Sequence, residues 1–178
     1  MSLAHTQVTF HYERLRAATT GIMEAAGATF LLLIAVRHFH AGPTAKALIA
    51  AGGSVGHLIS PLVVSRVEKL GWPVAQAAAR LGFVGAASLL LAVFAPGLPL
   101  YVLGSVLATT CASVSIPLMT QVYQMNYPPM ERGRLFSKAI VVRIGMAALA
   151  NELGGQLLAV HLEYFRALLP GFAAAFAF

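Results

Sequence analysis

Two apolar runs, separated by a short polar joint, constrain the fold of this chain more than any other feature. The runs cover residues 98–119 and 139–160. Each is about 20 residues long, which is what a helix rising about 1.5 Å per residue needs to cross a hydrocarbon core of about 30 Å. The joint holds Pro128 and Pro129, which stop the first helix because proline lacks a backbone N–H. The pattern predicts two membrane spans connected by a tight turn.

Three more runs of similar length precede this pair, and a shorter one follows it. They predict spans over about residues 17–36, 45–64 and 74–94. The last run, 167–178, is too short to span; it is either the start of a sixth helix or a segment lying in the membrane interface, and we favour the first because no polar cap ends it. We therefore expect an all-α, polytopic transmembrane bundle with five complete spans and a partial sixth. Residues 1–178 form a single domain on this interpretation.

Composition agrees with a membrane protein. Apolar residues make up 58% of the chain and charged residues 10%, whereas a soluble domain carries about 25% charged residues. The net charge of +6 does not indicate a nucleic-acid partner, because the basic residues lie at the ends of the apolar runs and form no dense patch. The single cysteine, Cys111, excludes an intrachain disulfide. We expect no metal and no cofactor.

The basic residues also predict an orientation. With the N-terminus inside, the inner segments hold Arg14, Arg16, Arg66, Lys69, Arg132, Arg134 and Lys138, and the outer segments hold Arg37, Lys46 and Arg166. Positive residues favour the cytoplasmic side of a bilayer. We therefore expect an integral protein of the plasma (cytoplasmic) membrane that begins with a short polar cytoplasmic tail up to Arg16.

Ionisable residues inside the predicted spans are the first candidates for function, because they are costly in lipid. Glu24 and Arg143 lie at similar depth, about 10 Å from the cytoplasmic end of their spans, and their opposite charges allow an ion pair. The alternative is that Arg143 extends to the interface and Glu24 is protonated. Glu152 lies nine residues from Arg143, on the opposite face of the helix, and the sequence does not tell which face meets a pathway.

Other polar and small residues complete the candidate set. The expected lining of a substrate or ion pathway is Glu24, Thr110, Gln121, Arg143, Asn151, Glu152 and Gln156. Small residues that let two helix backbones approach closely in lipid are Gly52, Gly56, Gly154 and Gly155. The expected cytoplasmic loop motif is Arg132, Gly133 and Arg134.

Three segments resemble the N-terminal half of a major facilitator superfamily transporter. The joint after the fourth span, Tyr127-Pro128-Pro129-Met130-Glu131-Arg132-Gly133-Arg134, is similar to the Pro-x-x-x-Arg-Gly-Arg turn of that family. The joint between spans two and three, with Gly56-His57-Leu58, Ser65-Arg66 and Gly71, resembles the family's glycine- and arginine-containing loop, although Ser65 stands where the family has aspartate. Residues 150–155, Ala-Asn-Glu-Leu-Gly-Gly, are similar to its antiporter motif without the Gly-Pro.

The resemblance covers about residues 17–160 and implies a function. It implies a secondary transporter, not an enzyme, that moves a small solute by alternating access between two six-helix halves, of which this chain is one. Its partners would be the lipid bilayer, the solute, and the missing C-terminal half or a second copy, with proton coupling left open. The alternative is a membrane scaffold subunit of a larger complex that transports nothing. No catalytic constellation favours an intramembrane enzyme.

Overall fold

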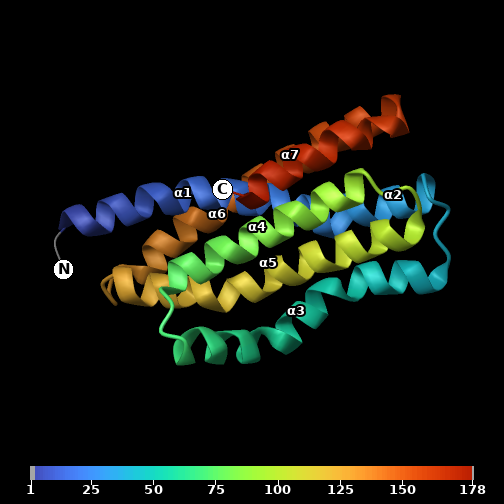
Figure 1. The fold of residues 1–178 in the computed structure, drawn as a ribbon. Helices are drawn as coiled ribbons and strands as arrows, with labels where there is room; N and C mark the ends of the chain where they lie inside the picture. Colours follow the sequence, from blue (N-terminus) through green and yellow to red (C-terminus); the bar gives the residue numbers. More distant parts are fainter. Residues whose placement is uncertain (1–2, 178) are drawn as a thin grey trace.

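Six helical segments, joined by short turns, build the molecule. The computed structural model describes residues 3–177, apart from the side chains of residues 3–7 and Ala28, and this part of the chain contains no strand. The elements are α1 (Leu3–Ala25), η1 (Ala26–Phe30), α2 (Leu31–Arg37), α3 (Pro43–Lys69), α4 (Val74–Val93), α5 (Leu98–Asn126), α6 (Arg132–Val160), η2 (Leu162–Tyr164) and α7 (Phe165–Ala177). The helices run back and forth along one common direction (Figure 1).

The first helical segment is a single rod made of α1, η1 and α2. Residues 26–30 form a π-helical turn, in which the N–H of Leu31 donates to the carbonyl of Ala26, five residues earlier. The rod begins at Leu3 among the described residues, so residues 3–16, which we expected to be a polar tail, are helical and continuous with the predicted first span. Apolar and polar residues are mixed there without proline or an internal glycine, and the helix continues into the predicted span.

Proline and glycine place the joints. Pro43 begins α3, and Pro99 lies in the first turn of α5, where a missing N–H costs nothing. Gly71 has φ +63°, the left-handed conformation that ends α3 and turns the chain into α4. Pro128 lies just beyond the end of α5 at Asn126, as the sequence predicted.

The helices pair in a symmetric pattern. The rod packs on α6 and α7, while α5 packs on α3 and α4, and α4 packs on α7. The first three helical segments correspond to the last three: the rod to α5, α3 to α6, and α4 to α7. Under this correspondence the rod–α6 contact matches α5–α3, and the rod–α7 contact matches α5–α4. Because the rod and α5 run in opposite directions, the two triplets are related as inverted repeats (Figure 1).

Glycines lie where these helices meet most closely. A methyl group added at Gly56 of α3 would lie 2.6 Å from the carbonyl oxygen of Thr110 in α5, and one at Gly104 of α5 would lie 2.5 Å from that of Ser88 in α4. Gly21 of the rod meets the backbone of α6 at Arg143 in the same way. Small residues of this kind let helix backbones touch.

The dense core lies toward the end of the bundle that holds the α2–α3 and α4–α5 joints. There Phe30 stacks on Phe172, and Phe39 contacts both Tyr101 and Phe165. The buried Tyr101 hydroxyl donates to the carbonyl of Leu31 at 2.9 Å, which ties α5 to the rod. This end of the bundle is closed by aromatic side chains.

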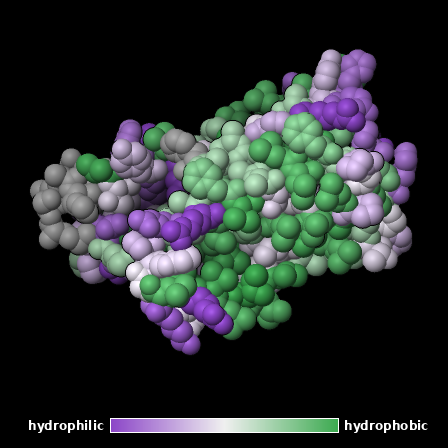
Figure 2. All heavy atoms as spheres, viewed as in Figure 1, coloured by the Kyte–Doolittle hydropathy of each residue, from purple (hydrophilic) through white to green (hydrophobic). Residues whose placement is uncertain are grey.

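The surface suits a lipid environment. Figure 2 shows apolar side chains over the middle of the visible face and polar side chains toward both ends. Large apolar residues that are exposed on the helices include Leu58, Leu62, Phe83, Val141 and Leu153. Among the described residues, the helices α3, α4 and α5 are long and apolar enough to cross a membrane. An all-helical membrane protein is the class that these features support.

Helices also lie at the remaining predicted spans, but α6 is more polar than α3, α4 and α5, and α7 is shorter than a span. Helix α6 is as long as α5, at 29 residues, but Arg143, Asn151 and Glu152 lower its mean hydropathy. Helix α7 has 13 residues and packs its end, Phe176, against Gly82 and Gly85 of α4; Phe178 lies outside the described residues. Crossing of the membrane by the rod, α6 and α7 remains a prediction.

The glycine contacts predict unequal effects of the same substitution. Gly56→Ala should destabilise the protein by about 1–3 kcal/mol, because the added methyl overlaps the α5 backbone. Gly155→Ala in α6 is the matched control: nothing lies within 4 Å of its added methyl, and alanine is about 1 kcal/mol better than glycine inside a helix. Thermal unfolding in detergent measures both. Equal stability of the two variants would contradict close α3–α5 packing at Gly56.

Candidate functional site

A cavity of about 830 Å³ lies inside the bundle and is the main candidate site. It extends from Leu31 and Ala108, in the middle of the helices, toward Glu13, Tyr123 and Phe136 near the end that holds the α5–α6 joint. Most of its wall is apolar. The charged side chains in the wall are Glu13, Arg16, Glu24 and Arg143, and the hydroxyl groups are those of Thr19, Thr20, Thr109, Ser113, Ser115, Thr120 and Tyr123. A volume of this size is typical of small-molecule sites.

Glu24 and Arg143 face each other across the cavity wall. The Nε atom of Arg143 lies 3.5 Å from Oε2 of Glu24, an ion pair between α1 and α6. The side chains of Arg143 and Glu24 are 37% and 48% exposed, and Arg143 Nε makes no hydrogen bond. The pair therefore remains open to a ligand on the cavity side. It places together the two residues that the sequence put at equal depth.

A second carboxylate, Glu13, lies deeper in protein than Glu24. Its side chain is buried and accepts a hydrogen bond from the hydroxyl of Tyr127, a buried residue of the α5–α6 joint. Burial raises the pKa of Glu13 above its ordinary value, against smaller lowering effects of the Tyr127 hydrogen bond and of the Arg16 charge. Burial and the Glu13 contact also raise the pKa of Tyr127.

Arg16 lies between these two carboxylates on α1. One of its terminal nitrogens donates to the hydroxyl of Tyr123 at 2.7 Å, and its guanidinium carbon lies 5.8 Å from the centre of the Tyr123 ring. The Tyr123 ring in turn stacks on that of Tyr127. Through these contacts one end of the rod is fixed to the end of α5.

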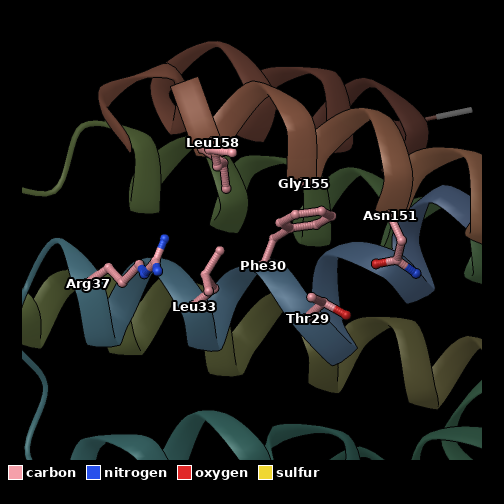
Figure 3. Close-up of a pocket in the computed structure, with 8 residues that line it drawn as sticks. Thr29, Phe30, Leu33, Arg37, Asn151, Gly155 and Leu158 are labelled. Carbon is pink, nitrogen blue, oxygen red and sulfur yellow. The ribbon is translucent and has the colours of Figure 1, made fainter. Parts of the chain in front are cut away.

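A groove between the rod and α6 forms a second, smaller cavity of about 450 Å³. Figure 3 shows Thr29 and Asn151 at one end, Phe30 and Leu33 in the middle, and Arg37 at the other end. The ring of Phe30 fills the space left by Gly154. Asn151 is thus the pathway candidate that lines this groove and not the central cavity.

The remaining pathway candidates do not line the central cavity. The Thr110 hydroxyl donates to the carbonyl of Gly52 at 2.9 Å and joins α5 to α3. Gln121 donates to Glu68 of α3 at 3.3 Å. Glu152 accepts a hydrogen bond from Gln156 at 2.6 Å, and both are exposed on the outer face of α6. The structure thereby answers the open question about α6: the Arg143 face meets the rod and the cavity.

The small residues and the loop motif have separate structural roles. Gly52, Gly56 and Gly154 each lie against a neighbouring helix, whereas Gly155 borders the groove with open space beside it. Arg132 donates from Nε to the carbonyl of Tyr127 at 3.0 Å and from a terminal nitrogen to that of Gln124, which satisfies the end of α5. Arg134 pairs with Glu131 at 3.5 Å, and Gly133 is exposed.

Glu13, Arg16, Tyr123 and Tyr127 are site residues that the sequence patterns did not single out. A signal for half of them is present: residues 13, 16, 20 and 24 are polar and follow the spacing of one helical face. Residues 3–16 have the composition of a polar tail, so the sequence analysis did not extend the helical pattern to Glu13 and Arg16. Among the described side chains, no three histidines, cysteines or carboxylates come together, and we assign no metal site.

Comparison with known proteins adds no relative. No family model, no curated protein and no solved structure matches the chain. The cavity itself is therefore the main evidence for function.

The ion pair predicts a non-additive effect on stability. Glu24→Gln or Arg143→Gln alone should destabilise the protein more than the two changes together, since each single change leaves an unpaired charge in an apolar wall. Thermal unfolding of the three variants in detergent is the measurement. Strictly additive losses would show that the two charges are not coupled.

Glu13 predicts a stability that falls as pH rises. The pKa of Glu13 is raised in the folded state above its ordinary value of 4.5. The protonated carboxyl then stabilises the folded state fully below pH 4.5, and this contribution is lost as the pH rises through the folded-state pKa. The variant Glu13→Gln keeps an oxygen that accepts from Tyr127 but carries no charge. We expect the unfolding midpoint of Glu13→Gln to rise relative to that of the unchanged protein between about pH 4.5 and 8, as measured by thermal unfolding.

The control for this experiment is Glu131→Gln, which removes a partly exposed carboxylate paired with Arg134. The stability of Glu131→Gln should change with pH in the same way as that of the unchanged protein. A constant difference between Glu13→Gln and the unchanged protein over the whole pH range would show that burial of Glu13 does not matter.

Proposed function

We propose that this chain is one half of a secondary transporter that moves a small solute across the membrane by alternating access. The observation that carries the proposal is the Glu24–Arg143 ion pair in the wall of a large cavity inside an apolar helical bundle. Ionisable groups at membrane depth are expensive, and in membrane proteins they usually mark a path for substrates or ions. A scaffold subunit has no need of such a cavity.

The helix pairing supports the same proposal. Transporters of the major facilitator superfamily contain two three-helix inverted repeats within each six-helix half. The two triplets of this chain pair as such repeats do, with the rod and α5 in equivalent, oppositely directed positions. The resemblance of the α5–α6 joint to the Pro-x-x-x-Arg-Gly-Arg turn of that family adds support from the sequence.

The shape of the cavity suits one state of an alternating-access cycle. Aromatic side chains close the end of the bundle at Phe39, Tyr101 and Phe165, and the cavity extends toward the opposite end. That opposite end carries most of the basic joint residues, such as Arg66 and Arg132. By the positive-inside rule it is the cytoplasmic side, so the proposed state is one that opens inward, with the N-terminus in the cytoplasm.

A half needs a partner, which is either a C-terminal half or a second copy. The outer face of α6 exposes Glu152 and Gln156, and their one mutual hydrogen bond leaves further donors and acceptors open, which cost several kcal/mol each in hydrocarbon. A second half covering this face would remove that cost. Small-residue contacts at Gly52, Gly56 and Gly154 are already used within the chain, so they do not serve as the dimer surface.

Reconstitution tests the proposal. We expect the purified chain in detergent either to have the mass of a two-copy assembly or to lose its fold over time, and we expect saturable uptake only in vesicles that hold the assembly. The uptake panel contains sugars, amino acids, drugs and organic acids. The variant Arg143→Gln should lower uptake, and Arg134→Gln, a change of an exposed arginine in the first turn of α6, is its control.

The other outcomes separate the alternatives. A stable monomer with saturable uptake would overturn the assignment as a half. A stable monomer, or a two-copy assembly, without uptake of any solute would favour a scaffold subunit.

A further inference from the structure

Arg16 is the arginine of the central cavity that forms no ion pair with the described side chains. Glu24 is engaged by Arg143, and Glu13 accepts from Tyr127. Among the described side chains, no carboxylate lies within 4.0 Å of the Arg16 guanidinium, and its protein contact is the neutral hydroxyl of Tyr123. Its Nε atom is buried and has no acceptor.

A half-buried guanidinium without an anion is an unfavourable arrangement. A guanidinium carries five N–H donors and forms its strongest hydrogen bonds with carboxylates and phosphates. Burial of an unpaired charge costs free energy that a bound anion recovers. Glu13 makes its hydrogen bond with Tyr127 and forms no ion pair with Arg16 among the described side chains.

The remainder of the wall requires an apolar body on such an anion. Beyond the two arginines, the cavity continues between apolar side chains of the rod, α3, α5 and α6. These include Met23, Ile49, Ile116, Met119 and Ile140. A small inorganic anion would leave this part of the cavity without contacts, whereas an amphipathic molecule would fill it.

We propose that the central cavity binds an amphipathic organic anion, whose charged group lies on Arg16 and whose apolar body lies among these side chains. This inference rests on the proposed transport function for its biological meaning, since it names the class of solute that the cavity accepts. The binding site itself is defined by the contacts of Arg16. An anionic lipid and a soluble organic acid share the required chemistry, and the experiment distinguishes them.

The test compares three probes with one apolar body: 4-phenylbutyrate, 4-phenylbutyramide and 4-phenylbutylamine. Each is titrated against the purified chain in a neutral detergent while thermal unfolding is recorded, because a ligand that binds the folded state raises the unfolding midpoint. We expect a saturable rise with the carboxylate, and none with the amide or the amine at the same concentrations. Equal effects of all three, or a preference for the amine, would overturn the proposal without any variant.

The variant Arg16→Gln should weaken binding of 4-phenylbutyrate by roughly tenfold or more, which corresponds to loss of a hydrogen bond to a charged group. Arg14→Gln is the matched control, because Arg14 is two residues away on the same helix, is exposed and does not line the cavity. Unchanged affinity in Arg16→Gln, or an equal loss in both variants, would contradict the role of Arg16.

Two further arms identify the source of the anion and separate this inference from the transport proposal. A rise with phosphatidylglycerol but not with phosphatidylcholine, lost in Arg16→Gln, together with no rise for 4-phenylbutyrate, would assign the anion site to a lipid. Binding of 4-phenylbutyrate through Arg16 without uptake into vesicles would support the site and contradict transport. Uptake of a neutral or cationic solute, with no binding of either anion, would support transport and contradict the anion site.

Discussion

Close contact between helix backbones is the constraint on which the rest of this structure depends. Lipid offers apolar side chains no reason to prefer protein over hydrocarbon, so helices in a membrane associate through fitting surfaces and not through hydrophobic burial. Here the fit is made at Gly21 between the rod and α6, at Gly56 between α3 and α5, and at Gly104 between α5 and α4. Each contact joins two helices and fixes the angle at which they meet. The symmetric pairing of the two triplets depends on these contacts.

The same contacts determine the chemistry of the cavity. Gly21 lies against the backbone of Arg143, and Glu24 lies about one turn beyond Gly21 on the rod. The close approach of the two helices therefore places the carboxylate and the guanidinium beside each other in the cavity wall. Without it, the two side chains would face an apolar surrounding singly, which is the costly state for an ionised group. The same contact between the rod and α6 therefore determines both the packing and the electrostatics at this site.

Regular features of the sequence predicted the helices and part of the site. Apolar runs and proline positions predicted a helix in each of the six segments, and the equal depth of Glu24 and Arg143 made their pairing one of two alternatives, the one that the structure has. The sequence did not reveal that α1 begins at Leu3, because its mean hydropathy is low and a polar stretch before a span has the composition of a tail. The sequence also did not show which face of α6 is buried. Glycines lie on one face and amide side chains near the other, and either face could pack against a neighbouring helix. Only the position of the rod decides that Arg143 faces inward and Glu152 outward.

The π-helical turn at Ala26–Phe30 lies where the two ends of the bundle differ. On one side of it the rod presents Arg16 and Glu24 to the cavity; on the other it buries Ile34 and Ala35 in the closed core. A π-helical turn inserts one extra residue, which rotates the later residues by about 100° relative to an uninterrupted α-helix. The rod can therefore direct a polar face to the cavity along one half of its length and an apolar face to the aromatic core along the other half. A hollow end and a closed end within one bundle fit a helix that changes its face in this way.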